Sequence, residues 1–393
     1  MVYIIRHGQT ALNKAKALQG RSNAPLNQAG EDQAREAGLR LRARGVRFHR
    51  VYSSPLDRAV HTAELITGSG AVQVDKRLIE MDYGPYEGAD LEHLPREVLT
   101  FFADFNNNPA PAGMEQLSSV IARLGEFLEE LKPVAENGDV LISTHAIAMK
   151  GALEYLTPES RGSYWSKYVG NCEIYAFELK NGVYTVPQPM AWSELDRMVT
   201  GQLYDPSDPE LTRLRVRVRK LARQYNQTDE DEPELQDKLL REMLPCSEAL
   251  PVFQAPVWLE YGRNVSFGPF CFANFNFTCM DVAPIRIGAQ VMIGPNVTLA
   301  TPMHPLCYED RNVRIRPDGS CYDLEYAKPI TIEQNCWIAS NVVICGGVTV
   351  GEGSVIGAGS VVTRDIPPHS LAVGNPCRVV RQITEQDRMD MER

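Results

Sequence analysis

The stretch that decides the fold of the C-terminal half is residues 330–363, ITIEQNCWIASNVVICGGVTVGEGSVIGAGSVVT. An aliphatic side chain recurs in it at every sixth position: Ile332, Ile338, Ile344, Val350, Ile356 and Val362. Amphipathic helices place apolar residues three and four apart, so a six-residue period argues against them. The period is typical of a parallel β-helix, in which each hexad supplies one short strand and one inward side chain. We therefore predict a β-helix over residues 255–385.

The hexad rhythm is interrupted once. The same spacing is already present upstream, at Ile287, Ile293 and Leu299. It then stops and resumes near Ile330, so residues 301–329 should leave the coil as a loop. A loop extruded from a solenoid is a frequent place for function. The loop opens with TPMHP at residues 301–305, where two prolines restrict the backbone around His304, a candidate site residue.

Residues 1–185 have a different texture, in which short β-rich runs alternate with helical patterns. Residues 2–5 and 140–144 are predicted strands, and residues 27–44 are a predicted helix that Asn27 can cap. Asn181-Gly182 is a hairpin signal. Strands separated by helices predict an α/β domain with a parallel-rich sheet.

Between these two regions lie a predicted linker and a helical segment. Residues 186–192 contain two prolines, which favour an irregular linker, and residues 193–393 form the second predicted domain, with helices over 193–250. Residues 213–219 alternate like a strand. A longer helical face competes with that pattern, formed by Leu211, Leu214, Val218, Leu221 and Tyr225. The longer pattern favours a helix, with its arginines on a solvated face.

Composition narrows the functional classes. The 393 residues carry 40 basic and 50 acidic side chains, a net charge of −10, which argues against nucleic-acid binding along the whole surface. No apolar stretch of 18 residues predicts a membrane span, and the N-terminus does not look like a signal peptide. Nine cysteines without Cys-x-x-Cys spacing indicate reduced thiols in the cytoplasm rather than a zinc site.

The first candidate site combines two histidines with two arginines. Arg6 and His7 follow the first predicted strand, and His145 follows the strand at 140–144. Because residues past the carboxyl ends of parallel strands line a common crevice, we expect the two histidines to meet. Guanidinium groups of Arg6 and Arg58 match a phosphoryl group, which a neutral imidazole can attack to form a phosphohistidine. Glu80 is the candidate proton donor to the departing alcohol.

Taken together, these segments resemble the histidine phosphatase superfamily, with its three-layer, phosphoglycerate mutase-like α/β fold. The motifs are RHGQT at residues 6–10, QGR at 19–21, SSPL with Arg58 at 53–58, Glu80 with YG at 83–84, and Thr144-His145. The resemblance covers residues 1 to about 180. It implies that His7 accepts the phosphoryl group, that Arg6, Arg58 and His145 hold its oxygens, and that Glu80 is the acid and then the base. It also implies that Asn13 and Gln19 line the pocket, and it implies no metal.

Residues 193–385 resemble the maltose/galactoside O-acetyltransferase family, whose helical cap precedes a left-handed β-helix. The matching motifs include GQLYDPSDP at residues 201–209, NFN at 274–276, IGPNV at 293–297, His304-Pro305, IGAGSVVT at 356–363 and GNP at 374–376. The resemblance implies a homotrimer with active sites between subunits, and acetyl transfer from acetyl-CoA to a sugar hydroxyl with His304 as general base.

The same resemblance assigns binding residues. The acceptor would contact Asn274, Glu260 and Asp205. Acetyl-CoA would contact Ser340, Ala358, Thr363, Arg364, Arg378 and Arg381, the arginines at its nucleotide end. Within the long loop after His304, Glu325 is a candidate to orient the imidazole.

These observations favour a cytoplasmic bifunctional enzyme that hydrolyses a small phosphoester, with sugar phosphates as one substrate class, and acetylates a sugar. The two reactions would be sequential if one sugar loses phosphate and is then acetylated. Four alternatives stay open: a phospho-ligand sensor at the N-terminus, a phosphoglycerate mutase-type activity there, two unrelated substrates, or a β-helix that serves chiefly for trimerisation. Intact Arg6–His7 and Arg58–His145 pairs argue against the sensor, and His304 with the CoA-side arginines argues against the scaffold.

Overall fold

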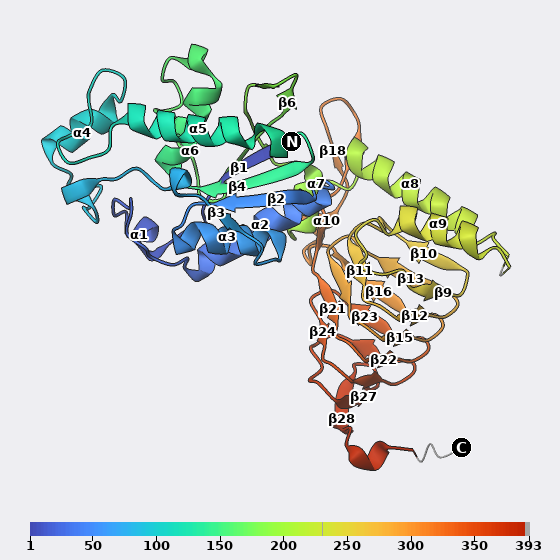
Figure 1. Ribbon diagram of the computed structural model, residues 1–393. Coiled ribbons are helices and arrows are strands. Elements are labelled where there is room, and N and C mark those ends of the chain that lie inside the picture. The colour runs from blue at the N-terminus through green and yellow to red at the C-terminus, as the bar shows by residue number, and fades with distance from the viewer. Residues whose placement is uncertain (230, 390–393) are drawn as a thin grey trace. The chain divides into compact units, whose positions relative to one another are not determined.

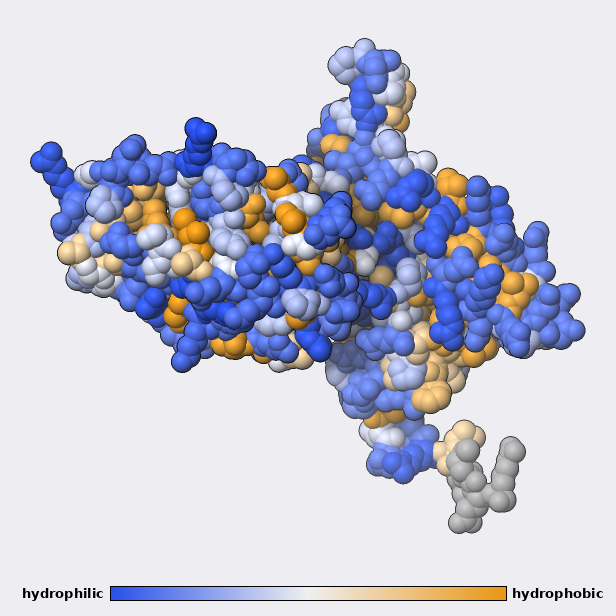
Figure 2. All heavy atoms as spheres, turned by 45° about the horizontal axis from the view of Figure 1, so that its top comes forward, coloured by the Kyte–Doolittle hydropathy of each residue, from blue (hydrophilic) through white to orange (hydrophobic). Residues whose placement is uncertain are grey.

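The protein is described from a computed structural model that covers residues 1–229 and 231–389, so residues 230 and 390–393 of the expected C-terminal domain lie outside the described residues. The chain divides into two compact units, Met1–Ala191 and Trp192–Arg393. On the visible face of each unit, hydrophilic side chains predominate and hydrophobic ones form small groups (Figure 2). In the described part of the chain, no helix has the length and apolar character needed to cross a membrane.

The N-terminal unit is built on a six-stranded sheet of order β3-β2-β4-β1-β5-β8 (Figure 1). The strands are β1 (Val2–Arg6), β2 (Phe48–Ser53), β3 (Gln73–Val74), β4 (Asp139–Thr144), β5 (Ile174–Phe177) and β8 (Gln188–Pro189). Strands β1, β2, β3 and β4 pair in parallel, whereas β5 and β8 are antiparallel additions. The predicted parallel-rich α/β sheet is confirmed, as are its strands at residues 2–5 and 140–144.

Helices cover both faces of this sheet. Alternate residues of β1 point to opposite faces, so Val2 and Ile4 join the core under α5 (Leu117–Ala135) and α6 (Ala146–Leu156). Tyr3 and Ile5 join the core under α2 (Gln28–Ala43) and α3 (Asp57–Thr67). The unit therefore has three layers (Figure 1). Its remaining elements are α1 (Ala11–Lys14), α4 (Arg96–Ala103), three 3₁₀ turns, and the β6–β7 hairpin (Leu179–Lys180, Val183–Tyr184).

Two local expectations for this unit can be checked directly. Asn27 caps α2, because its side chain accepts a hydrogen bond from the Gly30 amide. The structure corrects the expected linker at 186–192. Gln188–Pro189 pairs with β5 as the edge strand of the sheet, and the N-terminal unit extends to Ala191. Proline is tolerated there since an edge strand leaves one side unpaired, so the two prolines did not exclude a strand.

The C-terminal unit is the predicted β-helix, with three sheets of parallel strands around one core, to one of which the last strand, Arg378–Gln382, adds an antiparallel edge. From β9 to β26, apart from the strands of the loop at 301–329, successive strands enter the three sheets in turn, and the aliphatics of the hexad repeat are all buried. One sheet holds β10 (Val257–Leu259), β13 (Phe277–Met280), β16 (Thr298–Ala300), β23 (Val343–Cys345) and β26 (Val361–Val362). The second holds β11 (Val265–Phe267), β14 (Ile285–Ile287), β21 (Ile330–Ile332) and β24 (Thr349–Val350). The third holds β9 (Val252–Phe253), β12 (Phe272–Ala273), β15 (Met292–Ile293), β22 (Trp337–Ile338), β25 (Val355–Ile356), β27 (Ser370–Val373) and β28 (Arg378–Gln382).

One corner of the coil is held by a ladder of asparagines. Asn276, Asn296 and Asn341 all have φ near +60°, a left-handed conformation that asparagine tolerates better than most residues. The Nδ2 of Asn276 donates to Asn296 Oδ1 at 3.0 Å, and the Nδ2 of Asn296 donates to Asn341 Oδ1 at 3.1 Å. The backbone needs this conformation to turn from one short strand to the next, which explains why asparagines recur here.

Three helices precede the coil: α7 (Glu194–Val199), α8 (Pro209–Tyr225) and α9 (Pro233–Met243). The helix predicted across the alternating arginines is confirmed as α8, whose buried side chains are Leu211, Leu214, Val218, Ala222 and Tyr225. The last three join the same core as the first strands of the coil, and Tyr225 Oη donates to the Phe253 carbonyl oxygen.

The loop predicted at 301–329 also leaves the coil as expected, between β16 and β21. It contains β17 (Pro302–Met303), α10 (Tyr308–Arg311), β18 (Arg314–Ile315), β19 (Cys321–Tyr322) and β20 (Tyr326–Ala327). Strands β17 and β20 close its neck as an antiparallel pair.

Candidate active sites

Strand register brings the two predicted histidines together. Arg6 of β1 lies beside Thr144 of β4, so the next residues, His7 and His145, leave the sheet side by side. Their ring centroids are 5.1 Å apart, and the side chains are 3% and 0% exposed. The strand-end argument from the sequence therefore placed this pair correctly.

Arg58 and Gly8 orient the His7 ring. His7 Nδ1 lies 2.7 Å from the Gly8 carbonyl oxygen, which can only accept a hydrogen bond, so Nδ1 carries the proton. Nε2 keeps its lone pair and accepts from Arg58 Nε at 3.1 Å. The other two nitrogens of Arg58 donate to the carbonyl oxygens of Ser22 and Gly20, both at 2.6 Å. The ring thus presents an unprotonated nitrogen beside a guanidinium group.

Burial and neighbouring cations act on the protonation of this site. Burial, and then the charges of Arg58 and Arg6, hold the pKa of His7 well below its usual 6.5. Burial, followed by Arg58, lowers the pKa of His145 in the same way. Burial also lowers the pKa of Arg58 to about 10, which leaves it charged at neutral pH. The site therefore pairs neutral imidazoles with cationic guanidinium groups.

The Glu80 carboxyl group lies at the N-terminus of α6, the helix that begins directly after His145. Its Oε1 accepts hydrogen bonds from the amides of Met81 and Ala148, both at 2.9 Å, and its Oε2 accepts from Ile147 at 3.2 Å. Two of these amides belong to the first turn of α6, where a carboxylate is favoured. The buried carboxyl group of Glu80 is thereby fixed in position.

Among the described residues, three buried nitrogens of the expected site have no hydrogen-bond partner: Arg6 Nε, Gln19 Nε2 and His145 Nδ1. Since buried polar atoms are nearly always paired, such orphans mark a place for a polar ligand. Asn13 lies in the same region as Gln19, because its Nδ2 donates a hydrogen bond to Gln19 Oε1 at 3.2 Å. All the residues expected at the first site are thus in one region, with donors left over for an anion.

Sequence reasoning missed three residues of this region. Ser54 Oγ lies 2.7 Å from His145 Nε2, and the strand-end rule applied to β2 would have found it. Asn171 donates to the His7 carbonyl oxygen at 3.0 Å from a distant loop, and no pattern pointed to it. Lys150, one turn into α6, donates to the Trp165 carbonyl oxygen at 2.8 Å, and burial lowers its pKa to about 8.

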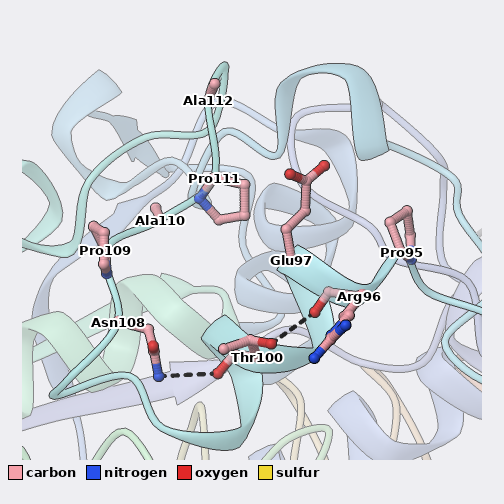
Figure 3. A pocket seen from close by; sticks show the side chains of 9 residues that line it. All are labelled: Pro95, Arg96, Glu97, Thr100, Asn108, Pro109, Ala110, Pro111 and Ala112. Atoms are coloured by element: carbon pink, nitrogen blue, oxygen red, sulfur yellow. Dashed lines mark hydrogen bonds between the residues drawn. The ribbon is translucent and has the colours of Figure 1, made fainter.

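A separate hollow of about 700 Å³ opens beside α4 (Figure 3). Its lining residues are Pro95, Arg96, Glu97, Thr100, Asn108, Pro109, Ala110, Pro111 and Ala112. Asn108 Nδ2 donates to the Thr100 carbonyl oxygen at 3.2 Å and tethers its two walls. None of the expected site residues lines it, so it plays no part in the sites assigned here.

The second site centres on His304, at the neck of the loop. His304 Nε2 lies 3.8 Å from Glu325 Oε1, within ion-pair range but too long for a hydrogen bond. Glu325 is itself fixed, because Tyr204 Oη donates to its Oε2 at 2.7 Å. The side chain of His304 is about half exposed, so its ring is open to a substrate.

The expected acceptor residues do not gather around His304 in one chain. Asn274 follows β12 and lies at the corner of the asparagine ladder, whereas His304 follows β16 at the next corner. Glu260 accepts from Arg219 at 2.7 Å and lines a separate hollow of about 260 Å³. Asp205 forms an ion pair with Arg316 of the long loop. Asp205 is therefore near the loop, and Asn274 lies at a different corner of the coil from His304.

Four of the residues expected to contact acetyl-CoA fall on two edges of the sheet that contains β23 and β26, whereas Arg378 and Arg381 lie in β28 of the third sheet. Ser340 and Ala358 lie at the asparagine corner, whereas Thr363 and Arg364 follow β26 at the His304 corner. Within the part of the chain that the structure describes, Arg378 Nη1 donates to the Cys377 carbonyl oxygen alone, at 2.7 Å. Arg381 is engaged by Asp387 through two hydrogen bonds, of 2.6 and 2.8 Å. Arg378 is thus the more available of the two cations for a phosphate.

Donor atoms that a metal could use occur together at one place in the described residues. They belong to His304, Asp323 and Glu325 and lie within 4.8 Å of one another. The sequence expectation of a metal-free protein stays a prediction.

Comparisons with known proteins agree with the division of the chain. The sequence model of the histidine phosphatase superfamily (branch 1) matches residues 2–188. The model of the maltose acetyltransferase hexapeptide capping motif matches residues 197–246, and that of the bacterial transferase hexapeptide (six repeats) matches residues 329–364.

Individual relatives match one half each. A candidate acetyltransferase of Schizosaccharomyces pombe is 43% identical over 202 residues, which are 49% of this chain and 93% of that protein. The galactoside O-acetyltransferase of Escherichia coli is 40% identical over 193 residues, covering 49% of this chain and 91% of the relative. A solved phosphoserine phosphatase of Entamoeba histolytica is 25% identical, with a TM-score of 0.44, and covers 49% of this chain and 98% of that one. The chain therefore joins a domain of the histidine phosphatase superfamily to a domain of the maltose and galactoside acetyltransferase hexapeptide family.

Proposed function

We propose that this chain is a bifunctional cytoplasmic enzyme, a phosphohistidine-dependent phosphatase joined to an acetyl-CoA-dependent sugar O-acetyltransferase. The observation that carries the first activity is the unprotonated His7 Nε2 beside Arg58. The second rests on the exposed His304 ring with a fixed carboxylate, together with the similarity to galactoside O-acetyltransferase. Nine unpaired cysteines suit a reducing compartment.

The phosphatase reaction would run in two steps. His7 Nε2 attacks phosphorus as the ester P–O bond breaks, and the Glu80 carboxyl group gives its proton to the departing alcohol. Arg6, Arg58 and His145 hold the phosphoryl oxygens, and the unpartnered buried nitrogens supply donors for them. Glu80 then takes a proton from water, which attacks the phosphohistidine and releases phosphate. The proposed substrate is a small phosphoester, and sugar phosphates are one class to test.

In acetyl transfer, His304 would take the proton of a sugar hydroxyl as that oxygen attacks the thioester carbonyl carbon. The C–S bond then breaks, and the proton passes to the departing thiolate. Glu325 positions the ring, and Tyr204 positions Glu325. Of Arg378 and Arg381, Arg378 is the more available to donate to a phosphate of acetyl-CoA, because Arg381 must first leave Asp387.

A homotrimer completes this second proposal. Asn274 and His304 lie at different corners of one coil, and we infer that a site that uses both takes them from two chains. An in-register apolar stripe supports contact between copies: Val252, Met292 and Trp337 lie on the outer face of one sheet and are 60%, 55% and 50% exposed. We also infer that α7, α8 and α9 cap the coil and that the coil is left-handed, as in the family.

The experiment that tests the proposal is a pair of substrate screens on the full chain. Phosphorylated metabolites are assayed for phosphate release, and sugars with acetyl-CoA are assayed for free thiol. Release that is lost in His7→Ala, and thiol production that is lost in His304→Ala, would support the assignment. Phosphoester binding without turnover would instead favour a phospho-ligand sensor in the N-terminal domain.

A further inference from the structure

At the neck of the loop at 301–329, three side chains of types that can bind a metal ion lie close together. Strands β17 and β20 pair Met303 with Tyr326, so the next position outward sets His304 opposite Glu325. Asp323 stands two residues before Glu325, the spacing that places side chains on one side of an extended chain. The donor atoms of His304, Asp323 and Glu325 consequently lie within 4.8 Å of one another.

The carboxylates of Asp323 and Glu325 differ in their hydrogen-bond partners. Tyr204 Oη occupies Glu325 Oε2, which leaves Oε1 facing His304 Nε2 at 3.8 Å. In the described residues, Asp323 has neither a hydrogen bond nor an ion pair. The loop's own arginines are directed elsewhere, for Arg316 pairs with Asp205 and Arg311 donates to carbonyl oxygens. Among the described residues, two carboxylates therefore face one imidazole, and no ion pair with a lysine or arginine engages either of them.

We propose that His304, Asp323 and Glu325 bind a first-row divalent cation such as Zn²⁺ or Co²⁺. One imidazole nitrogen and two carboxylate oxygens match the ligands these ions take, at metal–ligand distances of about 2.0–2.2 Å, with water at the fourth position. The donors would close by a small movement of side chains. The bound ion occupies the Nε2 lone pair of His304, so it inhibits acetyl transfer. This last consequence rests on the proposed function, whereas cation binding itself does not.

Cobalt is the probe for binding to the full chain. Tetrahedral Co²⁺ absorbs visible light far more strongly than the aqueous ion, so a stoichiometric visible band is expected on titration. Loss of an outer partner alone costs about 10–100-fold in metal affinity, so Asp323→Asn should weaken binding at least as much. The matched control is Asp318→Asn, an exposed aspartate of the same loop that bonds only to Ser320 in the described contacts.

Two results would overturn the site. One is equal Co²⁺ affinity in wild type and in Asp323→Asn. The other is a near-ultraviolet thiolate band that disappears in Cys307→Ser or Cys321→Ser, because both exposed thiols lie in this loop and would then be the ligands.

The inhibition arm uses Zn²⁺ in the acetyl-transfer assay. The concentration for half-inhibition should rise at least about tenfold in Asp323→Asn relative to Asp318→Asn. Equal inhibition of both variants would contradict the proposed effect on His304. If the wild-type chain transfers no acetyl group to any acceptor, the proposed function fails, and the Co²⁺ titration still decides whether the metal site exists.

Discussion

Arg58 Nε donates a hydrogen bond to His7 Nε2 over 3.1 Å, while Nδ1 of the same ring faces the Gly8 carbonyl oxygen at 2.7 Å. Together these contacts fix the tautomer of His7 and hold a cation next to its lone pair. A phosphoryl group that enters the site can exchange this hydrogen bond for one to its own oxygen. The same guanidinium group that orients the nucleophile can therefore hold the group under attack.

A phosphohistidine at His7 is the first expected outcome. Acid-labile, base-stable phosphate should appear on the protein after brief exposure to a phosphoester that it turns over. The His7→Ala chain should carry none, because no other ring has its lone pair presented beside Arg58 in the described site. The label is measured after rapid quenching at high pH. Phosphatase activity that needs a divalent metal and survives His7→Ala would contradict the assignment.

The pH dependence of phosphohistidine formation follows from the lowered pKa of His7. The ring stays neutral as the pH falls through 6.5, so the rate of labelling should hold there instead of dropping. The stability of the folded domain, in contrast, should change with pH over this range. Below pH 6.5 the unfolded chain protonates His7 and His145 while the folded domain does not, so its free energy of unfolding decreases, by up to about 1.4 kcal/mol per pH unit for each ring. Rapid-quench labelling and denaturant titrations between pH 5 and 7 check both statements.

Glu80→Gln separates the acid step from the nucleophile. The amide cannot donate a proton to the alcohol or take one from water, so turnover should fall by about 10²–10⁴-fold. A substrate with a good leaving group should still phosphorylate His7, and the phosphoenzyme should then accumulate. Single-turnover and steady-state rates on the same substrate test this. A variant that turns over at the wild-type rate would remove Glu80 from its role.

His304 and Arg378 should fail in different ways. His304→Ala should lower the acetyl-transfer turnover number by about 10²–10⁴-fold while acetyl-CoA still binds. Arg378→Ala should weaken acetyl-CoA binding through loss of a charge-assisted hydrogen bond of about 1.5–3 kcal/mol. Titration calorimetry with acetyl-CoA and thiol-release kinetics distinguish the two. Near-normal turnover in His304→Ala would mean that another group is the base.

Each of the two domains should fold as a separate fragment, and the edge strand β8 should belong to the N-terminal fragment. The fragment 1–191 should retain phosphatase activity, and 193–393 should form trimers with acetyltransferase activity. Fragment 1–185 lacks β8 and two capping contacts, from Arg40 to the Met190 carbonyl oxygen and from Arg44 to that of Ala191. It should therefore unfold at a lower denaturant concentration than 1–191. Equal midpoints would show that the edge strand adds nothing.

Much of the architecture was predictable because it depends on short-range repeats of apolar residues in the sequence. The hexad spacing predicts the coil and the place where the loop leaves it, since each buried aliphatic depends only on its position in the repeat. His7 and His145 were predictable for a similar reason, because the ends of neighbouring parallel strands meet at one edge. The strand at 188–189 was not predictable, since a short edge strand needs few favourable residues of its own. It forms because the neighbouring strand β5 offers unpaired backbone groups.

The sequence by itself determined the two domains, the coil, and the residue types able to hold a phosphoryl group and to deprotonate a hydroxyl. Only the tertiary structure decided which of them meet. It set Ser54 against His145, positioned Glu325 through Tyr204, and placed Asn274 and His304 at different corners of the coil. These pairings join residues far apart in the chain, and their geometry depends on how whole elements pack, which no local period encodes.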